Sequence, residues 1–144
     1  MSRQGNRSVR RAFTLIELLL VMVILAILAA VVVPKFTARS EQAKISAAKT
    51  TIANLDTALD AFEVDMGRYP NANEGLAVLL NPPSDAGTNW HGPYIKKDVG
   101  NDPWGHPYIY RCPGQYNKSG YDLVSMGPDG KEGGGDDIDN WSNK

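Results

Sequence analysis

The fold of this chain is decided by residues 10–17, which read Arg10-Arg11-Ala12-Phe13-Thr14-Leu15-Ile16-Glu17. Here a basic start meets an apolar run, Phe13 to Val33, in which the only polar side chains are Thr14 and Glu17. At about 1.5 Å per helical residue this run spans roughly 31 Å, close to the ~30 Å hydrocarbon core of a bilayer. The run therefore predicts a membrane-spanning helix that carries one carboxylate near its start.

The first twelve residues contain four arginines and no acidic residue, namely Arg3, Arg7, Arg10 and Arg11. The positive-inside rule places this end in the cytoplasm and the rest of the chain across the membrane. The apolar run is longer than the roughly 7–15 residues of a secretory signal, and Pro34 follows it in place of a small-residue cleavage site.

Glu17 is not explained by a plain single-pass anchor. A carboxylate in hydrocarbon costs about 2.5–3.5 kcal/mol on insertion scales, so we expect Glu17 to have a partner or a function. The alternative interpretation is a glutamate at the helix end that reaches toward the lipid head groups.

Beyond Pro34 the sequence predicts a continued helix and then a small sheet. Apolar residues recur at steps of three and four and form one stripe, made of Ile45, Ala48, Ile52, Leu55, Leu59, Phe62 and Met66. Pro34 is expected to kink or loosen the helix, and Gly67 with the following Tyr69-Pro70 to end it at about residue 66. Short strands are predicted around 108–110 and 121–124. The expected fold class is α+β, with a long N-terminal helix packed on a small antiparallel sheet.

Charge and side-chain chemistry exclude several function classes. Removal of residues 1–12 changes the formal charge from −1 to −5, so the exported part is acidic and nucleic acid is not an expected partner. Cys112 is the only cysteine, which rules out an internal disulfide. The two histidines, His91 and His106, have no zinc-type spacing with it, and Ser125 lies in no nucleophile motif. We therefore expect that this protein is not an enzyme.

The segment from Ala12 to Glu17 resembles the leader of type IV pilins and type II secretion pseudopilins. This resemblance implies that a prepilin peptidase cuts between Ala12 and Phe13 and methylates the new amino terminus at Phe13. Ala12 departs from the pattern, because the family usually has glycine there. The resemblance also implies that Glu17 meets the amino terminus of a neighbouring subunit during assembly, where an unpaired partner would be strongly penalised.

Later segments resemble the major pseudopilins of type II secretion, namely Gly67-Arg68-Tyr69-Pro70, Glu74-Gly75-Leu76, Trp90 to Ile95 and Asp102 to Tyr110. The resemblance implies a type IV pilin-like fold with a cleaved leader (1–12), a transmembrane and assembly segment (13–33) and a periplasmic domain (34–144). It implies an inner-membrane protein that polymerises into a periplasmic pseudopilus and drives folded proteins through an outer-membrane secretin. The implied partners are further copies, minor pseudopilins, the prepilin peptidase and the inner-membrane assembly platform.

The stretch from Met126 to Trp141 is rich in oxygen ligands and in glycine, which suits a hard cation such as calcium although the EF-hand pattern is absent. The resemblance selects Asp129 and Asp137 as carboxylate ligands and the backbone carbonyl of Met126 among the others. Asp136 could replace Asp137, because loop length varies among relatives, and Asp139 stands where the family often has glycine. The alternative is a flexible acidic tail.

Two other functions fit part of the sequence. One is a type IV pilin subunit of a surface fibre, which the lone Cys112 and the tryptophan-rich loops disfavour. The other is a membrane-tethered calcium-binding domain that does not polymerise.

Overall fold

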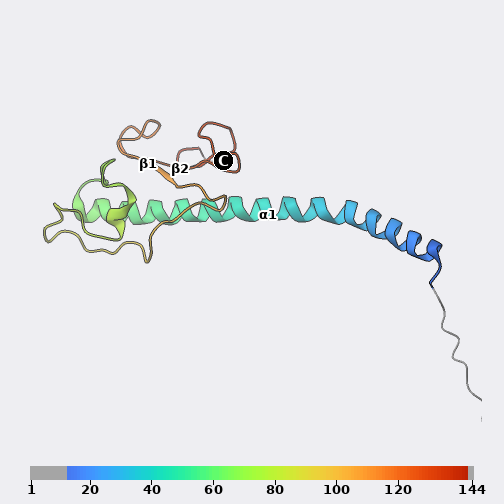
Figure 1. The fold of residues 1–144 in the computed structure, drawn as a ribbon. Coiled ribbons are helices and arrows are strands. Elements are labelled where there is room, and N and C mark those ends of the chain that lie inside the picture. Colours follow the sequence, from blue (N-terminus) through green and yellow to red (C-terminus); the bar gives the residue numbers. More distant parts are fainter. Residues whose placement is uncertain (1–12, 143–144) are drawn as a thin grey trace, which may run out of the picture. The chain divides into compact units, whose positions relative to one another are not determined.

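The computed structural model describes residues 13–142, and within 33–37 it describes the backbone only. The predicted leader, including Ala12, lies outside the described residues. The described chain forms two compact units, one ending at Ser40 and the other beginning at Glu41. Its elements, in order, are α1 (Leu15–Met66), the 3-10 helix η1 (Gly75–Leu79), β1 (Ile109–Arg111), β2 (Asp122–Ser125) and β3 (Ile138–Asp139) (Figure 1).

The first unit consists of the apolar start of α1. Among the described residues, Leu15–Val32 is the one helical segment long and apolar enough to cross a membrane, with a mean hydropathy of 3.2. Its large apolar side chains are exposed all around the helix, from 46% at Val32 to 79% at Leu15. A helix that is apolar on every side is stable only inside a membrane or among other apolar helices. Helical backbone continues through Pro34, so this proline does not end the helix.

The second unit is built on the other part of α1, and here the predicted apolar stripe is confirmed. Ala48, Leu59 and Phe62 are fully buried, while Ile45 and Met66 pack against the edge of the same core. The helix ends as predicted, because Gly67 adopts a φ of +71° and its N–H donates to the carbonyl of Glu63 at 2.7 Å. Glycine takes this left-handed conformation without a steric penalty.

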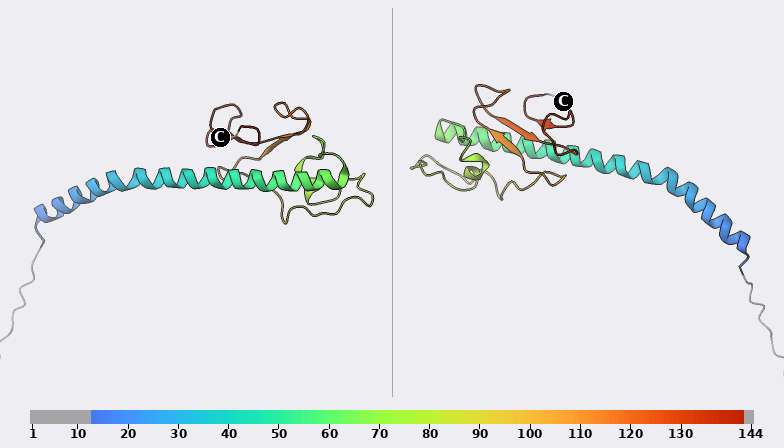
Figure 2. Two further views of the ribbon diagram at one scale, coloured as in Figure 1. Left: turned by 180° about the vertical axis from the view of Figure 1, so that it is seen from behind. Right: turned by 45° about the horizontal axis from the view of Figure 1, so that its top comes forward.

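The sheet is antiparallel in the order β1-β2-β3, and it lies along the green part of α1 in both views of Figure 2. Tyr110 pairs with Leu123, and Ser125 pairs with Ile138. All residues of this central strand, β2, are buried. Leu123 belongs to the core that includes α1, whereas the Asp122 carboxylate is covered by the loop at 115–117, whose N–H groups donate to it. The two predicted strands exist, each shifted by one residue, so that Tyr108 and Tyr121 fall outside them. β3 was not predicted. The α+β class is confirmed.

Aromatic side chains fasten the long loops onto this core by their polar atoms. Trp90 Nε1 donates to the carbonyl of Val78 at 3.0 Å, and the Tyr94 hydroxyl donates to Asp65 of α1 at 2.6 Å. These contacts give the aromatic side chains a structural role, since a tryptophan or tyrosine packed against a core is stable when its polar atom finds a partner.

Candidate functional sites at the amino terminus and in the C-terminal loop

At the start of α1, Thr14 and Glu17 form reciprocal hydrogen bonds. The N–H and hydroxyl of Thr14 both donate to Glu17 Oε2 at 2.9 Å, and the N–H of Glu17 donates to Thr14 Oγ1 at 3.3 Å. This is a capping box, which satisfies backbone donors that a helix start leaves without intrahelical partners. The carboxylate predicted to act in assembly therefore lies at the helix end, beside Phe13.

The loop between β2 and β3 carries the predicted calcium ligands, and its carboxylates order its own backbone. Asp129 Oδ1 accepts from the N–H of Lys131 at 2.8 Å, and Asp137 Oδ2 accepts from the N–H of Gly133 at 2.6 Å. Asp136 Oδ2 accepts from the N–H of Asp129 at 3.2 Å. Each of the three carboxylates thus uses one oxygen to fold the loop.

The tip of this loop is also tied to the sheet. Arg111 of β1 forms a two-pronged ion pair with Glu132. The guanidinium beside Glu132 holds the pKa of that carboxyl below its usual range. Internal hydrogen bonds and this ion pair give the segment a defined conformation, which a flexible acidic tail would not have.

The second oxygen of each of these three carboxylates accepts none of the loop hydrogen bonds described above. Asp136 Oδ1 and Asp137 Oδ1 are buried and have no hydrogen-bond partner among the described residues. Asp129 Oδ2 and Asp136 Oδ1 approach the same backbone position, since a Cβ on Gly134 would lie 2.5 Å from the first and 2.7 Å from the second. Buried carboxylate oxygens without donors are unfavourable alone, and a bound cation would offset this cost.

The structure therefore brings Asp129 together with Asp136, which the sequence offered as the substitute for Asp137. Asp137 lies one residue further on, against Gly133, with its free oxygen buried. Met126 follows β2 directly and precedes the turn at 127–130 that carries Asp129. Within residues 13–142 no group of three or more His, Cys, Asp or Glu residues is arranged to hold a metal by side chains alone. A cation here would need backbone carbonyls or water to complete its shell.

Asp139 has a different task. Its Oδ1 accepts from the N–H groups of Trp141 and Ser142, at 3.1 and 2.5 Å, and its Oδ2 accepts from the Ser142 hydroxyl at 2.8 Å. Both oxygens are occupied in closing the last turn of the described chain. Asp139 is therefore unsuited as a ligand.

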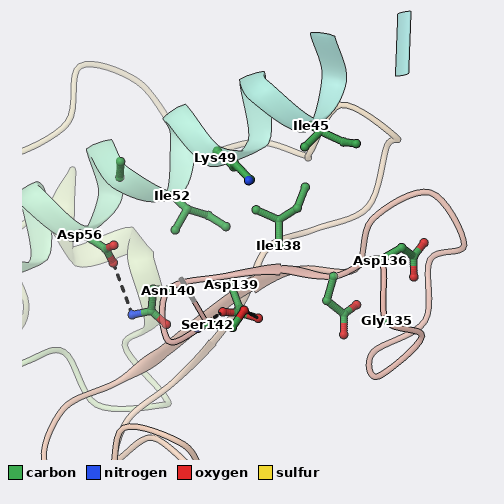
Figure 3. A pocket seen from close by; sticks show the side chains of 12 residues that line it. Ile45, Lys49, Ile52, Asp56, Gly135, Asp136, Ile138, Asp139, Asn140 and Ser142 are labelled. Carbon is green, nitrogen blue, oxygen red and sulfur yellow. Dashed lines mark hydrogen bonds between the residues drawn. The ribbon is translucent and has the colours of Figure 1, made fainter. Parts of the chain in front are cut away.

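A cavity of about 450 Å³ separates the carboxylate end of this loop from α1 (Figure 3). Ile45 and Ile52 of α1 and Ile138 of β3 form its apolar wall. At the far end Asn140 Nδ2 donates to Asp56 Oδ1 at 3.5 Å, and burial raises the pKa of Asp56. The described residues that line the cavity form no arrangement of nucleophile and base.

Sequence reasoning missed one buried polar cluster near the loop. The side chain of Asp102 is fully buried, and its Oδ1 accepts from the N–H groups of Trp104 and His106 at 3.0 and 2.8 Å. Its Oδ2 accepts from the Ser125 hydroxyl at 2.6 Å. The sequence Asp102-Pro103-Trp104-Gly105 signals a turn closed by an aspartate, but nothing local in it points to Ser125.

Comparison with known proteins decides the family. Residues 35–141 match the family model for type II secretion system protein G, and residues 7–33 match the prokaryotic N-terminal methylation motif. The chain belongs to the type II secretion system protein G family. Its resemblance to the major pseudopilins is thereby confirmed.

Within the protein G family, the chain is similar over nearly its whole length to curated relatives named type II secretion system core protein G. It is 44% identical over 143 residues to the protein of Pseudomonas aeruginosa, and the matched region covers 96% of this chain and 99% of that relative. It is 42% identical over 136 residues to that of Escherichia coli K12, covering 92% and 91%. A crystal structure of the major pseudopilin from the type 2 secretion system of enterohaemorrhagic Escherichia coli superposes with a TM-score of 0.58 at 32% identity, covering 76% of this chain and 96% of that one.

Proposed function

We propose that this chain is the major pseudopilin subunit that polymerises into the periplasmic pseudopilus of a type II secretion system and drives folded proteins through the outer-membrane secretin. The observation that carries this proposal is the exposed apolar surface of α1 from Leu15 to Val32. Such a surface is stable only where it is kept away from water. Lipid does this for the single subunit in the membrane, and apolar neighbouring subunits do it in a fibre. The protein acts as a structural subunit and not as an enzyme.

The subunit reaches the fibre through the inner membrane. The match of residues 7–33 to the methylation motif supports cleavage between Ala12 and Phe13 and methylation of Phe13 by a prepilin peptidase. The basic leader supports an orientation with residues 1–12 in the cytoplasm and 34–144 in the periplasm. Minor pseudopilins and the inner-membrane assembly platform are the further partners.

Glu17 is the assembly residue of this proposal. Cleavage would create an ammonium group on Phe13, close to the carboxylate that Thr14 already orients. The carboxylate of one subunit would pair with the ammonium of a neighbour. In an apolar surrounding such a pair fixes register, because a subunit out of register leaves a buried charge unpaired.

The C-terminal loop is proposed to hold one calcium ion. Asp129 and Asp136 would supply adjacent carboxylate oxygens, with the free oxygen of Asp137 and the carbonyl of Met126 as further ligands. When bound, the ion would neutralise the carboxylates and join the two sides of the loop. Supporting this assignment are the two buried oxygens without donors and the glycine at 134, where any side chain would fill the space between Asp129 and Asp136.

Secretion in a strain that lacks the gene tests the proposed function. Plasmid-borne wild-type chain should restore release of folded exoproteins into the medium, whereas Glu17→Val should insert in the membrane and leave them in the periplasm. Normal secretion in the deletion strain would refute the role. Loss of surface adhesion or motility with secretion intact would instead identify a surface pilin.

A further inference from the structure

The turn that carries Asp129 is held by Ser125, at the end of β2 just before it, and by the segment 102–106, which is more than twenty residues away in the sequence. We propose that Ser125, Asp102 and His106 are positioning residues of the calcium loop, which fix the backbone from Gly127 to Gly130 and thereby place the Asp129 carboxylate. This inference rests on the calcium site proposed above.

The first connection is a chain of buried hydrogen bonds. The Ser125 hydroxyl donates to Asp102 Oδ2 at 2.6 Å and accepts from the N–H of Gly127 at 3.3 Å. Ser125 is fully buried at the end of β2, and the Asp102 side chain is likewise inaccessible. Because Asp102 only accepts, it orients the hydroxyl so that a lone pair faces Gly127. The first residue of the turn is thus bonded to the buried cluster.

The second connection is a close packing of the His106 ring against the other end of the turn. A Cβ on Gly130 would lie 2.7 Å from His106 Nε2 and 2.9 Å from its Cε1, so the ring occupies the side of Gly130 where a side chain would stand. The backbone that carries this ring is held, since the backbone N–H of His106 donates to Asp102 Oδ1 at 2.8 Å. One carboxylate therefore controls both ends of the turn.

On its opposite side, the turn packs against the backbone of Asp136. A Cβ on Gly127 would lie 2.5 Å from the carbonyl oxygen of Asp136. Gly127 and Gly130 both have positive φ, +63° and +67°, which suits a turn with no room for side chains at these positions. Asp129 therefore lies between two held residues, Gly127 and Gly130. Its carboxylate and that of Asp136 both lie beside Gly134.

The cluster itself has no nucleophilic arrangement. The Ser125 hydroxyl donates to Asp102 and not to His106, and His106 Nδ1 lies 3.8 Å from Asp102 Oδ1 without a hydrogen-bond partner among the described residues. A serine nucleophile would need the histidine as its base. The cluster instead contacts the turn at 127–130, through Ser125 at Gly127 and His106 at Gly130.

Calcium titration calorimetry on the full-length chain in detergent tests the inference, with melting followed by tryptophan fluorescence. The variants are Ser125→Ala and His106→Ala. The control is Asn101→Ala, because the Asn101 side chain donates to the carbonyl of Gly105 at 2.9 Å, inside the segment 101–107, and makes no hydrogen bond to the turn at 127–130 in the described part of the chain. Substitution of a residue that orients a metal ligand typically lowers metal affinity by about 10–100-fold. We therefore expect each test variant to bind calcium at least about tenfold more weakly than the parent, and the control to bind it as the parent does.

The outcomes separate the two proposals. A parent chain that binds no calcium removes the metal site and the positioning role with it. A parent that binds, with both test variants binding equally well but melting lower by the same amount in calcium and in chelator, overturns the positioning role alone. If Ser125→Ala does not fold, His106→Ala decides, since that side chain is one-third exposed and only its packing on the turn is lost.

Discussion

Thr14 and Glu17 accept hydrogen bonds from each other's backbone N–H groups, at 2.9 Å onto Glu17 Oε2 and 3.3 Å onto Thr14 Oγ1. The carboxylate is therefore oriented within its own chain before any neighbour arrives. In an apolar environment, orientation in advance reduces the entropy lost when an ion pair forms. Glu17 thus caps the helix, and its proposed assembly role can be separated from the cap by substitution.

We expect processing to depend on the small residue before the proposed cut. Ala12→Gly should be processed at least as fast as the parent, and Ala12→Leu should block processing, because the peptidases of pilin-like proteins need a small side chain there. Mass spectrometry of protein from cells with the peptidase should find a mature chain that begins at methylated Phe13. A mature chain that begins elsewhere would contradict the leader assignment.

Core packing of the second unit can be tested on one turn of α1. Phe62→Ala should lower the free energy of unfolding by about 3–5 kcal/mol, because the ring is fully buried and leaves a cavity. Val64→Ala is the matched control, since Val64 is 81% exposed two residues away, and its effect should stay within about 0.5 kcal/mol. Urea unfolding followed by tryptophan fluorescence measures both. Equal effects would mean that the assigned helix face is wrong.

Sequence periodicity was sufficient for α1 because burial of one stripe, from Ile45 to Met66, decides which face of the helix packs. It was less informative for the sheet. β3 has only two residues, Ile138 and Asp139, and it follows a run of glycine and aspartate that is typical of a tail. Its existence depends on pairing with β2, a contact between distant residues that no local pattern indicates.

The candidate sites were predictable to a similar degree. The leader and Glu17 are local signals, so they could be identified directly, and the carboxylates of the C-terminal loop could be named as a group. Whether Asp136 or Asp137 lies beside Asp129 depends on how the loop closes over Gly134. The link from Asp102 to Ser125 joins residues 23 positions apart and exists only in the folded chain.

Acid sensitivity should depend in part on Asp122. Burial alone would raise its pKa, but the N–H groups of Asn117, Tyr116 and Gln115 donate to the carboxylate and hold the pKa below its usual range. A lowered pKa in the folded state gives stability that is present above the unfolded value of about 3.9 and is lost as the pH falls through the folded value.

We therefore expect Asp122→Asn to destabilise the second unit by about 2 kcal/mol at pH 7, since hydrogen bonds to a charged group contribute about 1.5–3 kcal/mol. The difference from the parent should shrink below pH 4. Urea unfolding at pH 7 and pH 3 measures it, with exposed Asp98→Asn as control. A difference that is the same at both values would show that the charge of Asp122 contributes nothing.

The proposed calcium ligands can be ranked by melting the full-length chain in excess calcium and then in chelator. Calcium should raise the parent's melting temperature, because a ligand that binds only the folded state stabilises it by mass action. Asp129→Ala and Asp136→Ala should abolish most of this rise, since their free oxygens meet at Gly134, and Asp137→Ala should reduce it. Asp139→Ala should melt lower in both conditions and keep the rise. An Asp129→Ala chain that responds as the parent does would contradict the site.

Fibre formation in cells that overproduce the chain with its secretion partners tests the central claim most directly, by electron microscopy of sheared filaments and by cross-linking of intact cells. The parent should give filaments and a ladder of cross-linked oligomers. Glu17→Gln, which can keep the cap to Thr14 but has no charge to offer a neighbour's Phe13 ammonium, should be inserted, cleaved and unable to form filaments. Absence of filaments and ladder from the parent would refute a polymerising subunit, and normal filaments from Glu17→Gln would refute the charge pairing.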